Sequence, residues 1–256
     1  MRLILHLAGT KYPLPLHYHE FVQAAIYHAM GPRWADHVHN RGFPINGRPF
    51  RLFTFSRLMG RYVLSRHHQT ITFPEGCMIV ISSPVDDLIA AIAQQFLQHS
   101  TMQIGDVSLD ITRIEGQTVD AVNPAAPLYA LETLSPITVH SLTETSEGQR
   151  FTQYYPPHDP RFAELLRNNL LRKHRAFTHW TGKLEHLNDS AALEVFPLKV
   201  RKHVLRYRQI VIEGYSGTFA LSGHPSLIQI GVEAGFGSNN AQGFGCVTPL
   251  HVQGGL

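Results

Sequence analysis

The sequence is poor in cysteine and has no long hydrophobic run. Its two cysteines, Cys77 and Cys246, lie 169 positions apart, which fits neither a disulfide framework nor a metal-binding motif. We expect two buried thiols in a reducing compartment. Apolar stretches such as Leu3 to Leu7 fall far short of the ~20 residues that a membrane-spanning helix needs. The first residues also lack the long apolar segment and cleavage site of a secretory signal, so we expect a cytoplasmic protein without membrane contact.

Charge is scarce as well, but apolar and aromatic residues are plentiful. Charged residues make up 16% of the chain and hydrophobic residues 43%, with fourteen Phe and nine Tyr. This composition excludes bulk disorder and supplies a sizeable core. A length of 256 residues suits two compact domains or one large one.

The net charge of +3 conceals a strongly basic segment. Between Arg161 and Arg208, eleven Lys or Arg residues stand against four acidic residues, a local charge of +7. Most of the eleven are Arg, whose planar guanidinium can hold a phosphate through two hydrogen bonds. An ordinary solvated surface is the alternative. We predict contacts with an anionic partner for the following residues: Arg172, Lys173, Arg175, Lys199, Arg201, Lys202, Arg206 and Arg208.

The first half of the chain alternates between the periodicities of strands and helices. Strands are predicted at Arg2 to Leu7, Arg51 to Arg57, Cys77 to Ser82 and Val107 to Ile114. Helices are predicted at His17 to Met30, Arg33 to about His39, and Pro84 to about His99. Apart from the short extra helix, this is the β-α-β-β-α-β order of a ferredoxin-like unit.

The same order recurs in the second half, after a predicted linker at 123–127 that contains two prolines. Strands are predicted at Leu128 to His140, Leu193 to Val200, Leu205 to Gly214 with a continuation near Phe219, and Gly243 to Val252. Helices are predicted at Asp159 to Arg175 and Pro225 to Ala234. We therefore predict an α+β protein with tandem ferredoxin-like (RRM-like) domains at 1–122 and 128–256. A single mixed α+β domain is the alternative.

Glycine is concentrated between the last predicted helix and the last strand, with five glycines in residues 231–245. Without side chains there, backbone N–H groups can approach a ligand closely. No Lys-Ser or Lys-Thr pair of a phosphate-binding Walker loop follows, and a dinucleotide loop would precede its helix. A flexible connector is the alternative. Ligand contacts are predicted for Gly235, Gly237, Ser238, Asn239, Asn240, Gln242, Gly243 and Gly245.

The spacing of these glycines resembles the C-terminal glycine loop of the CRISPR-associated endoribonucleases that process repeat RNA. Two Gly-Phe-Gly triplets, at 235–237 and 243–245, are separated by five residues. Three N-terminal blocks are similar to segments of the same family in the same order: Ala25-Ile26-Tyr27-His28-Ala29, Val38-His39-Asn40-Arg41-Gly42-Phe43 and Arg51-Leu52-Phe53-Thr54-Phe55-Ser56-Arg57-Leu58. The middle of the chain, from about Asp86 to Val200, matches only in pattern.

The resemblance implies an enzyme that cuts CRISPR repeat RNA (pre-crRNA) to mature crRNA in antiviral defence. Its implied chemistry uses neither a metal ion nor another cofactor: a 2′-hydroxyl attacks the phosphate and leaves 2′,3′-cyclic phosphate and 5′-hydroxyl ends. The implied partner is repeat RNA or crRNA, bound by the basic and glycine-rich residues named above, and other effector-complex subunits are further candidates. The alternative is an RNA-binding subunit of a CRISPR effector complex that does not cut.

His39 lies in the block where the family's catalytic histidine is found, and histidine titrates in the range that proton transfer requires. The resemblance implies Tyr27 and Arg51 as its partners. Tyr27 would position the nucleophile or assist proton transfer, and Arg51 would stabilise charge on the phosphate. Family members often have Lys at the position of Arg51, and Arg is a poor proton donor. His37 and His28 are the alternatives to His39.

Three histidine-rich stretches raise the possibility of a metal site: His17-Tyr18-His19, His37-Val38-His39 and His67-His68. Residues two apart on a helix point to different sides, and no cluster of cysteines or carboxylates completes a set of four ligands. We therefore expect no metal site.

Overall fold

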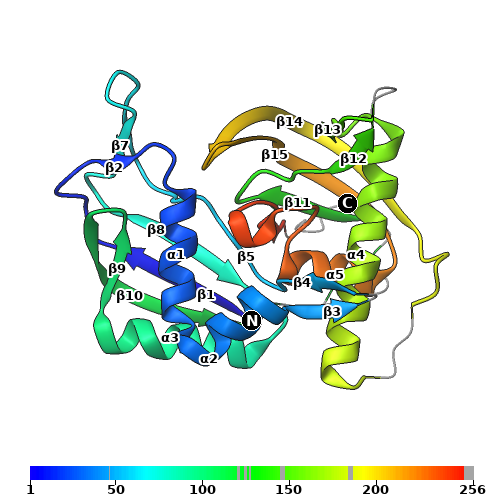
Figure 1. Ribbon diagram of the computed structural model, residues 1–256, viewed down its shortest axis with the longest axis horizontal. Coiled ribbons are helices and arrows are strands. Elements are labelled where there is room, and N and C mark those ends of the chain that lie inside the picture. The colour runs from blue at the N-terminus through cyan, green and yellow to red at the C-terminus, as the bar shows by residue number, and fades with distance from the viewer. Residues whose placement is uncertain are drawn as a thin grey trace, which may run out of the picture.

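The computed structural model describes residues 1–45, 47–119, 122–123, 126, 128–144, 148–183 and 187–250. Two antiparallel sheets, each packed against helices, form two units that lie side by side (Figure 1). None of the helices in these ranges is long and apolar enough to cross a membrane.

The first unit is ferredoxin-like. Its sheet has the order β5-β8-β1-β10-β9, and α1 and α3 pack against it. Along the chain the elements run β1-α1-β5-β8-α3-β10, so that the first four sheet positions hold the second, third, first and fourth strands of a β-α-β-β-α-β unit. Strand β9 is an additional edge. The elements are β1 (Arg2–Leu7), α1 (His19–Ala29), β5 (Thr54–Phe55), β8 (Cys77–Ser82), α3 (Asp86–His99), β9 (Thr101–Ile104) and β10 (Val107–Gln117).

The second unit repeats this arrangement. Its sheet has the order β14-β15-β11-β16, which again places the second, third, first and fourth strands side by side. The prediction of two ferredoxin-like units is therefore confirmed. The elements are β11 (Tyr129–Thr133), α4 (Pro160–Thr181), β14 (Leu193–Tyr207), β15 (Ile210–Gly223), α5 (Pro225–Ala234) and β16 (Val247–Pro249).

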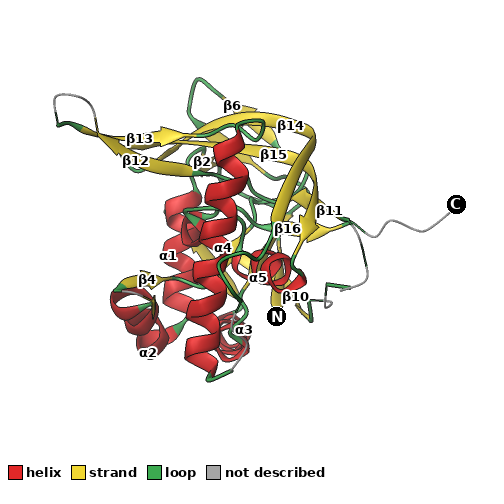
Figure 2. Ribbon diagram, turned by 90° about the vertical axis from the view of Figure 1, so that its right-hand side faces the viewer, coloured by secondary structure: helices red, strands yellow, loops and turns green. Residues whose placement is uncertain are grey.

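Smaller elements connect or extend these units. The hairpin β12/β13 projects from the body of the molecule (Figure 2). A π-helical turn, η1, follows α2, and η2 is a 3₁₀ turn inside the glycine-rich segment. The remaining bounds are β2 (Leu14–Pro15), α2 (Gly31–Asp36), η1 (His37–Arg41), β3 (Phe43–Ile45), β4 (Arg48–Phe50), β6 (Val63–Ser65), β7 (Thr70–Thr72), β12 (His140–Glu144), β13 (Arg150–Tyr154) and η2 (Asn240–Gln242).

Several predicted strands are wrong in extent. The one at 205–214 begins at Ile210 and continues to Gly223 as β15, and the closing strand predicted from Gly243 begins at Val247. The one at 51–57 shrinks to β5, because Phe53 N–H turns back to the carbonyl of Arg51 instead of pairing with β8. The one at 128–140 ends at Thr133, and Pro136 lies in the loop that follows. The strand predicted to end at Val200 continues to Tyr207, since its alternating residues stay paired with β15. Residues 124, 125 and 127 of the predicted linker and 251–252 of the closing strand lie outside the described residues.

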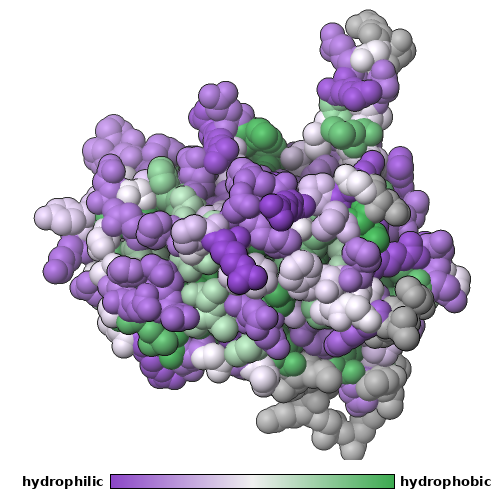
Figure 3. Space-filling view, turned by 60° about the horizontal axis from the view of Figure 1, so that its bottom comes forward, coloured by the Kyte–Doolittle hydropathy of each residue, from purple (hydrophilic) through white to green (hydrophobic). Residues whose placement is uncertain are grey.

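The two units share one hydrophobic core and are joined by hydrogen bonds at the edge strand β5. Thr54 Oγ1 donates to the carbonyl of Phe244 over 2.9 Å. Ser135 Oγ donates to the carbonyl of Phe55 over 3.0 Å. The buried Arg2 guanidinium donates to carbonyl oxygens of the second unit. Both cysteines are buried thiols, as predicted. Outside the core, hydrophilic residues prevail on the face drawn in Figure 3, where hydrophobic ones form small separate groups.

Candidate active site

A cavity of about 570 Å³ lies between the two units. The first unit contributes α1, η1 and the segment after β4. The second contributes α4, the tip of the β14/β15 hairpin and the glycine loop, defined here as residues 235–245. The side chains predicted to react and several of those predicted to bind line this one cavity: Tyr27, His39, Arg51, Lys173, Arg208, Ser238, Asn239, Asn240 and Gln242.

Tyr27, His39 and Arg51 meet although they come from three separate segments. The rings of Tyr27 and His39 are arranged edge to face, with centroids 5.9 Å apart. Arg51 Nη2 donates to the carbonyl oxygen of His39 over 3.2 Å. Burial raises the pKa of Tyr27, and the positive charge of Arg51 acts in the opposite direction. The Tyr27 hydroxyl therefore remains a proton donor near neutral pH.

A π-helical turn directs His39 toward this cavity. Gly42 N–H bonds to the carbonyl of His37, five residues back, so η1 contains one residue more per turn than an α-helix. Gly42 has a φ of 59° and ends the turn. The rings of His37 and His39 consequently face different surroundings.

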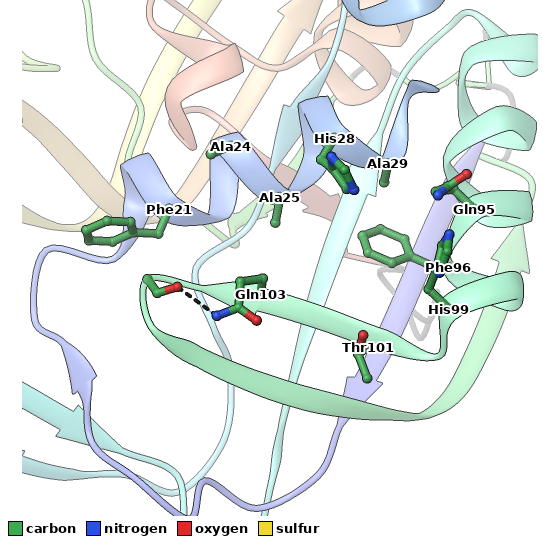
Figure 4. A pocket seen from close by; sticks show the side chains of 11 residues that line it. Phe21, Ala24, Ala25, His28, Ala29, Gln95, Phe96, His99, Thr101 and Gln103 are labelled. Carbon is green, nitrogen blue, oxygen red and sulfur yellow. Dashed lines mark hydrogen bonds between the residues drawn. The ribbon is translucent and has the colours of Figure 1, made fainter. Parts of the chain in front are cut away.

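The alternative histidines lie in other cavities. His37 packs against Trp180, with ring centroids 4.9 Å apart, beside a cavity of about 420 Å³. His28 points into a third cavity, lined by α1, by Gln95 and His99 of α3, and by the β9 edge (Figure 4). Neither lines the cavity that contains Tyr27 and Arg51. Among the described residues, His39 is the only histidine that lines that cavity.

The glycines of the glycine loop are buried, and their role as direct ligand contacts stays a prediction. Gly235, Gly237, Gly243 and Gly245 all have φ between 72° and 87°. A Cβ on Gly245 would lie 2.0 Å from the carbonyl oxygen of Phe236, and one on Gly243 would lie 2.5 Å from the ring of Phe55. The N–H groups of Gly243 and Gly245 bond to carbonyls within the protein. These glycines therefore allow the loop to pack against the protein interior.

Lys173 and Asn240 line the cavity, and their polar atoms hold the glycine loop. Lys173 Nζ donates to the carbonyls of Gly235 (2.6 Å) and Gly237 (2.9 Å) and to Asn240 Oδ1 (2.6 Å). Asn240 Nδ2 donates to the carbonyls of both Phe236 and Phe244. Burial lowers the pKa of Lys173, but three oxygen acceptors match the three donors of the charged ammonium and favour that form. The polar atoms of both side chains are therefore engaged within the protein, and their contact with RNA stays a prediction.

The other polar residues of the glycine loop, Ser238, Asn239 and Gln242, are partly exposed at the cavity. Gln242 Oε1 is itself buried and has no hydrogen-bond partner within the described residues. The three side chains place hydrogen-bonding groups at the cavity that His39 also lines.

The basic residues of the second unit occupy three kinds of place. Arg172 is half-buried on α4, and Arg175 forms an ion pair with Asp189. Four exposed basic residues lie on β14 itself: Lys199, Arg201, Lys202 and Arg206. Arg208 lies at the tip of the β14/β15 hairpin, near Glu20 of α1. Strand alternation places Lys199 and Arg201 on the face of Tyr207, which borders the cavity, and Lys202 and Arg206 on the opposite face. Lys202 is paired with Glu213 over 2.7 Å.

Sequence reasoning missed several residues that line the cavity. Glu20 and Gln23 precede Tyr27 by seven and four positions, a spacing that predicts one helix face. Gln23 accepts a hydrogen bond from the Tyr207 hydroxyl and donates to the carbonyl of Ala241 over 2.6 Å. Asn169 precedes Lys173 by one helical turn. These residues could have been predicted from the sequence by their helical spacing from Tyr27 and Lys173.

Histidines and carboxylates do not gather into a metal-binding group. Within the ranges that the structure describes, no three His, Cys, Asp or Glu side chains are placed to hold a metal ion. His67 and His68 stack edge to face in an exposed turn.

Comparisons with known proteins agree along the whole chain. Residues 13–115 match the family described as CRISPR-associated protein Cas6, N-terminal, and residues 125–249 match CRISPR associated protein Cas6, C-terminal. A protein of Methanocaldococcus jannaschii named CRISPR-associated endoribonuclease Cas6 1 is 28% identical over 96% of this chain and 92% of its own. A solved structure described as CRISPR associated protein Cas6 is 27% identical, covers 98% of this chain and 99% of its own, and has a TM-score of 0.78. A Cas6-related structure from Pyrococcus furiosus is 21% identical over 99% of both chains, with a TM-score of 0.82.

Proposed function

Because this chain belongs to the Cas6 family of CRISPR-associated proteins, we propose that it is an endoribonuclease that cuts CRISPR repeat RNA to crRNA. The observation that carries the proposal is the meeting of Tyr27, His39 and Arg51 in one cavity. In this proposal the N-terminal domain, residues 1–122, supplies the reacting groups. The C-terminal domain, residues 128–256, holds the RNA.

The proposed reaction is an internal transesterification. His39 Nε2 takes the proton from the 2′-hydroxyl, whose oxygen attacks the adjacent phosphorus and forms a bond to it. The bond from phosphorus to the 5′ oxygen breaks, and that oxygen takes a proton from the Tyr27 hydroxyl. Arg51 stabilises the extra negative charge on the phosphate without giving up a proton. Solvent returns the proton from the His39 imidazolium to Tyr27, leaving a 2′,3′-cyclic phosphate and a 5′-hydroxyl.

Two groups of residues are proposed to hold the RNA beside this site. Ser238, Asn239 and Gln242 offer hydrogen bonds at the cavity, where unstacked bases of single-stranded RNA can be read. Arg208, Arg201 and Lys199 continue along the hairpin face that borders the cavity and would contact phosphates.

The substrate's own 2′-hydroxyl provides the sharpest test. Purified protein incubated with repeat RNA in excess EDTA should cut it, and the products should carry the ends given above. A single 2′-deoxy substitution 5′ of the cut should stop the reaction, whereas the same substitution elsewhere in the repeat should not. Cleavage of the first deoxy substrate would refute internal attack.

The same assay separates the enzyme from a binding subunit. The resemblance implies Lys in many family members at the position of Arg51, and the weaker proton donation of Arg favours a slow or non-cutting protein. Tight binding of intact repeat RNA with no product after prolonged incubation would establish that alternative.

A further inference from the structure

We propose that Asn40 is a positioning residue that fixes the proton of His39 on Nδ1 and so leaves Nε2 free as the base, an inference that rests on the proposed function. Asn40 Oδ1 lies 2.8 Å from His39 Nδ1. Asn40 Nδ2 donates to Asp36 Oδ1 over 2.7 Å. The three side chains thus form a chain that ends at the edge of the cavity.

The direction of each hydrogen bond follows from the carboxylate. Asp36, when ionised, can only accept hydrogen bonds, so it must face the NH₂ group of the Asn40 amide. The amide oxygen then faces His39, and because that oxygen is an acceptor only, Nδ1 of a neutral His39 must carry the hydrogen. The lone pair of the imidazole is therefore on Nε2. Free imidazole side chains in water favour the opposite tautomer, so the protein has to impose this one.

The local backbone explains why these residues meet. Asp36 ends α2 and Asn40 lies four residues later, the spacing that places two side chains on one helix face. The Tyr27 ring contacts the imidazole edge to face, and Arg51 holds the His39 carbonyl. The ring is thus constrained on its face, at its backbone and at Nδ1, and Nε2 is the nitrogen without a hydrogen-bond partner among the described residues.

Several charged or titratable groups surround His39 and would influence its pH response. Tyr27 and Glu20 come from α1, Arg51 from the segment after β4, Lys173 from α4, and Arg208 from the hairpin tip. Asp36 is the charged group at the far end of the Asn40 chain. Asn40→Ala leaves it and all of these groups unchanged, so a change in the pH profile of that variant reports on Asn40.

Three variants test the inference by single-turnover cleavage of repeat RNA across pH. Asn40→Ala removes the acceptor and should lower the cleavage rate about 10- to 100-fold, as loss of an orienting partner does elsewhere, with RNA affinity unchanged. The double variant Asp36→Asn/Asn40→Asp restores an acceptor at position 40 without placing two carboxylates together, and should recover most of the rate. Its carboxylate also stabilises the imidazolium, so the acidic limb of the profile should move to higher pH. Asp36→Asn should fall between wild type and Asn40→Ala.

A second readout does not depend on cleavage. In ¹⁵N-labelled protein, the His39 signals, assigned by their loss in His39→Ala, should show the Nδ1–H tautomer in wild type and mainly Nε2–H in Asn40→Ala. If wild type cuts no repeat RNA, the proposed function fails while the tautomer measurement still decides on Asn40. An unchanged tautomer in Asn40→Ala, or a slow Asn40→Ala variant whose rate the double variant Asp36→Asn/Asn40→Asp does not recover, would overturn the inference.

Discussion

The two walls of the cavity differ in how their polar groups are used. The N-terminal wall consists of Tyr27, His39 and Arg51, two of which are exposed. The C-terminal wall is formed by the glycine loop with Lys173, whose ammonium group is buried and bonded to three oxygens. Groups that react with a substrate must be free to exchange partners, whereas groups that fix a loop must not. The comparison therefore assigns chemistry to the first wall and shape to the second.

The strongest sequence motif, the pair of Gly-Phe-Gly triplets, therefore does not mark the reacting side chains. The Gly-Phe-Gly triplets are the sharpest signal in the sequence, yet Phe236 and Phe244 are almost fully buried. Lys173 reaches the loop from α4, 62 positions away from Gly235. A side chain at such a distance in sequence is recognisable as a loop partner only once the fold is known.

The largest expected effect is on the C-terminal wall. Gly245→Ala forces a Cβ to within 2.0 Å of the Phe236 carbonyl oxygen at a φ of 72°, so we expect a loss of more than about 4 kcal/mol in the free energy of unfolding. Gly182→Ala is the matched control, since its φ is 66° but nothing lies within 4 Å of the new Cβ. It should cost only about 1 kcal/mol. Similar urea midpoints for the two variants would contradict a packed loop.

Two adjacent cations on α4 provide the next comparison. Lys173→Met removes three hydrogen bonds from buried oxygens and should lower the free energy of unfolding by roughly 3 kcal/mol. Arg172→Met removes the same charge one residue earlier and should weaken RNA binding while changing stability little. Thermal unfolding and RNA titration of both variants measure the two effects. If Lys173→Met instead weakened RNA binding and Arg172→Met lowered stability, the assignment of the two residues would be wrong.

The stability of the packing beneath the glycine loop should depend on pH. His19 packs beneath Gly243, and burial lowers its pKa to about 4. Between the unfolded value of about 6.5 and pH 4, the unfolded chain binds more protons than the folded one, so the free energy of unfolding should fall as pH falls, by roughly 3 kcal/mol in all. His19→Phe keeps a ring without a titrating group, and its stability should depend less on pH over this range. Equal slopes for both proteins would exclude His19 as the cause.

The smallest effect concerns the two faces of β14. Replacing Lys199 and Arg201 by Ala removes charges on the face that borders the cavity, and should flatten the slope of log affinity against log salt by about 1.4 for single-stranded RNA. Replacing Lys202 and Arg206 removes equal charge from the other face and should change the slope less. Fluorescence anisotropy over a salt series measures both, and a larger effect from the second pair would move the RNA path to the outer face.

Much of the fold follows from local patterns. The bounds of β1, β8 and α5 agree with their predicted ranges because continuous apolar runs and a Pro at the helix start are strong local signals. The strand of β14 was predicted to end at Val200 because its extension to Tyr207 depends on pairing with β15, which the local sequence does not show.

The candidate site is predictable only in part. The resemblance to a family pointed to Tyr27, His39 and Arg51, which do lie together. The burial of Lys173 and Asn240 depends on how α4 packs against a loop much later in the chain, and a residue's own type gives no sign of that. Asn40 could not be distinguished from any surface amide until Asp36 and His39 were seen on either side of it.

The central claim, that chemistry resides on the N-terminal wall, is tested most directly by comparing three single histidine variants. Single-turnover cleavage and RNA affinity should be measured for His39→Ala, His28→Ala and His37→Ala. We expect His39→Ala to slow cleavage by about 10²- to 10⁴-fold with affinity nearly unchanged. The other two histidines lie in separate cavities, so their variants should cut within a few-fold of the wild-type rate. Wild-type cleavage by His39→Ala, or its loss in His28→Ala or His37→Ala alone, would contradict the central claim.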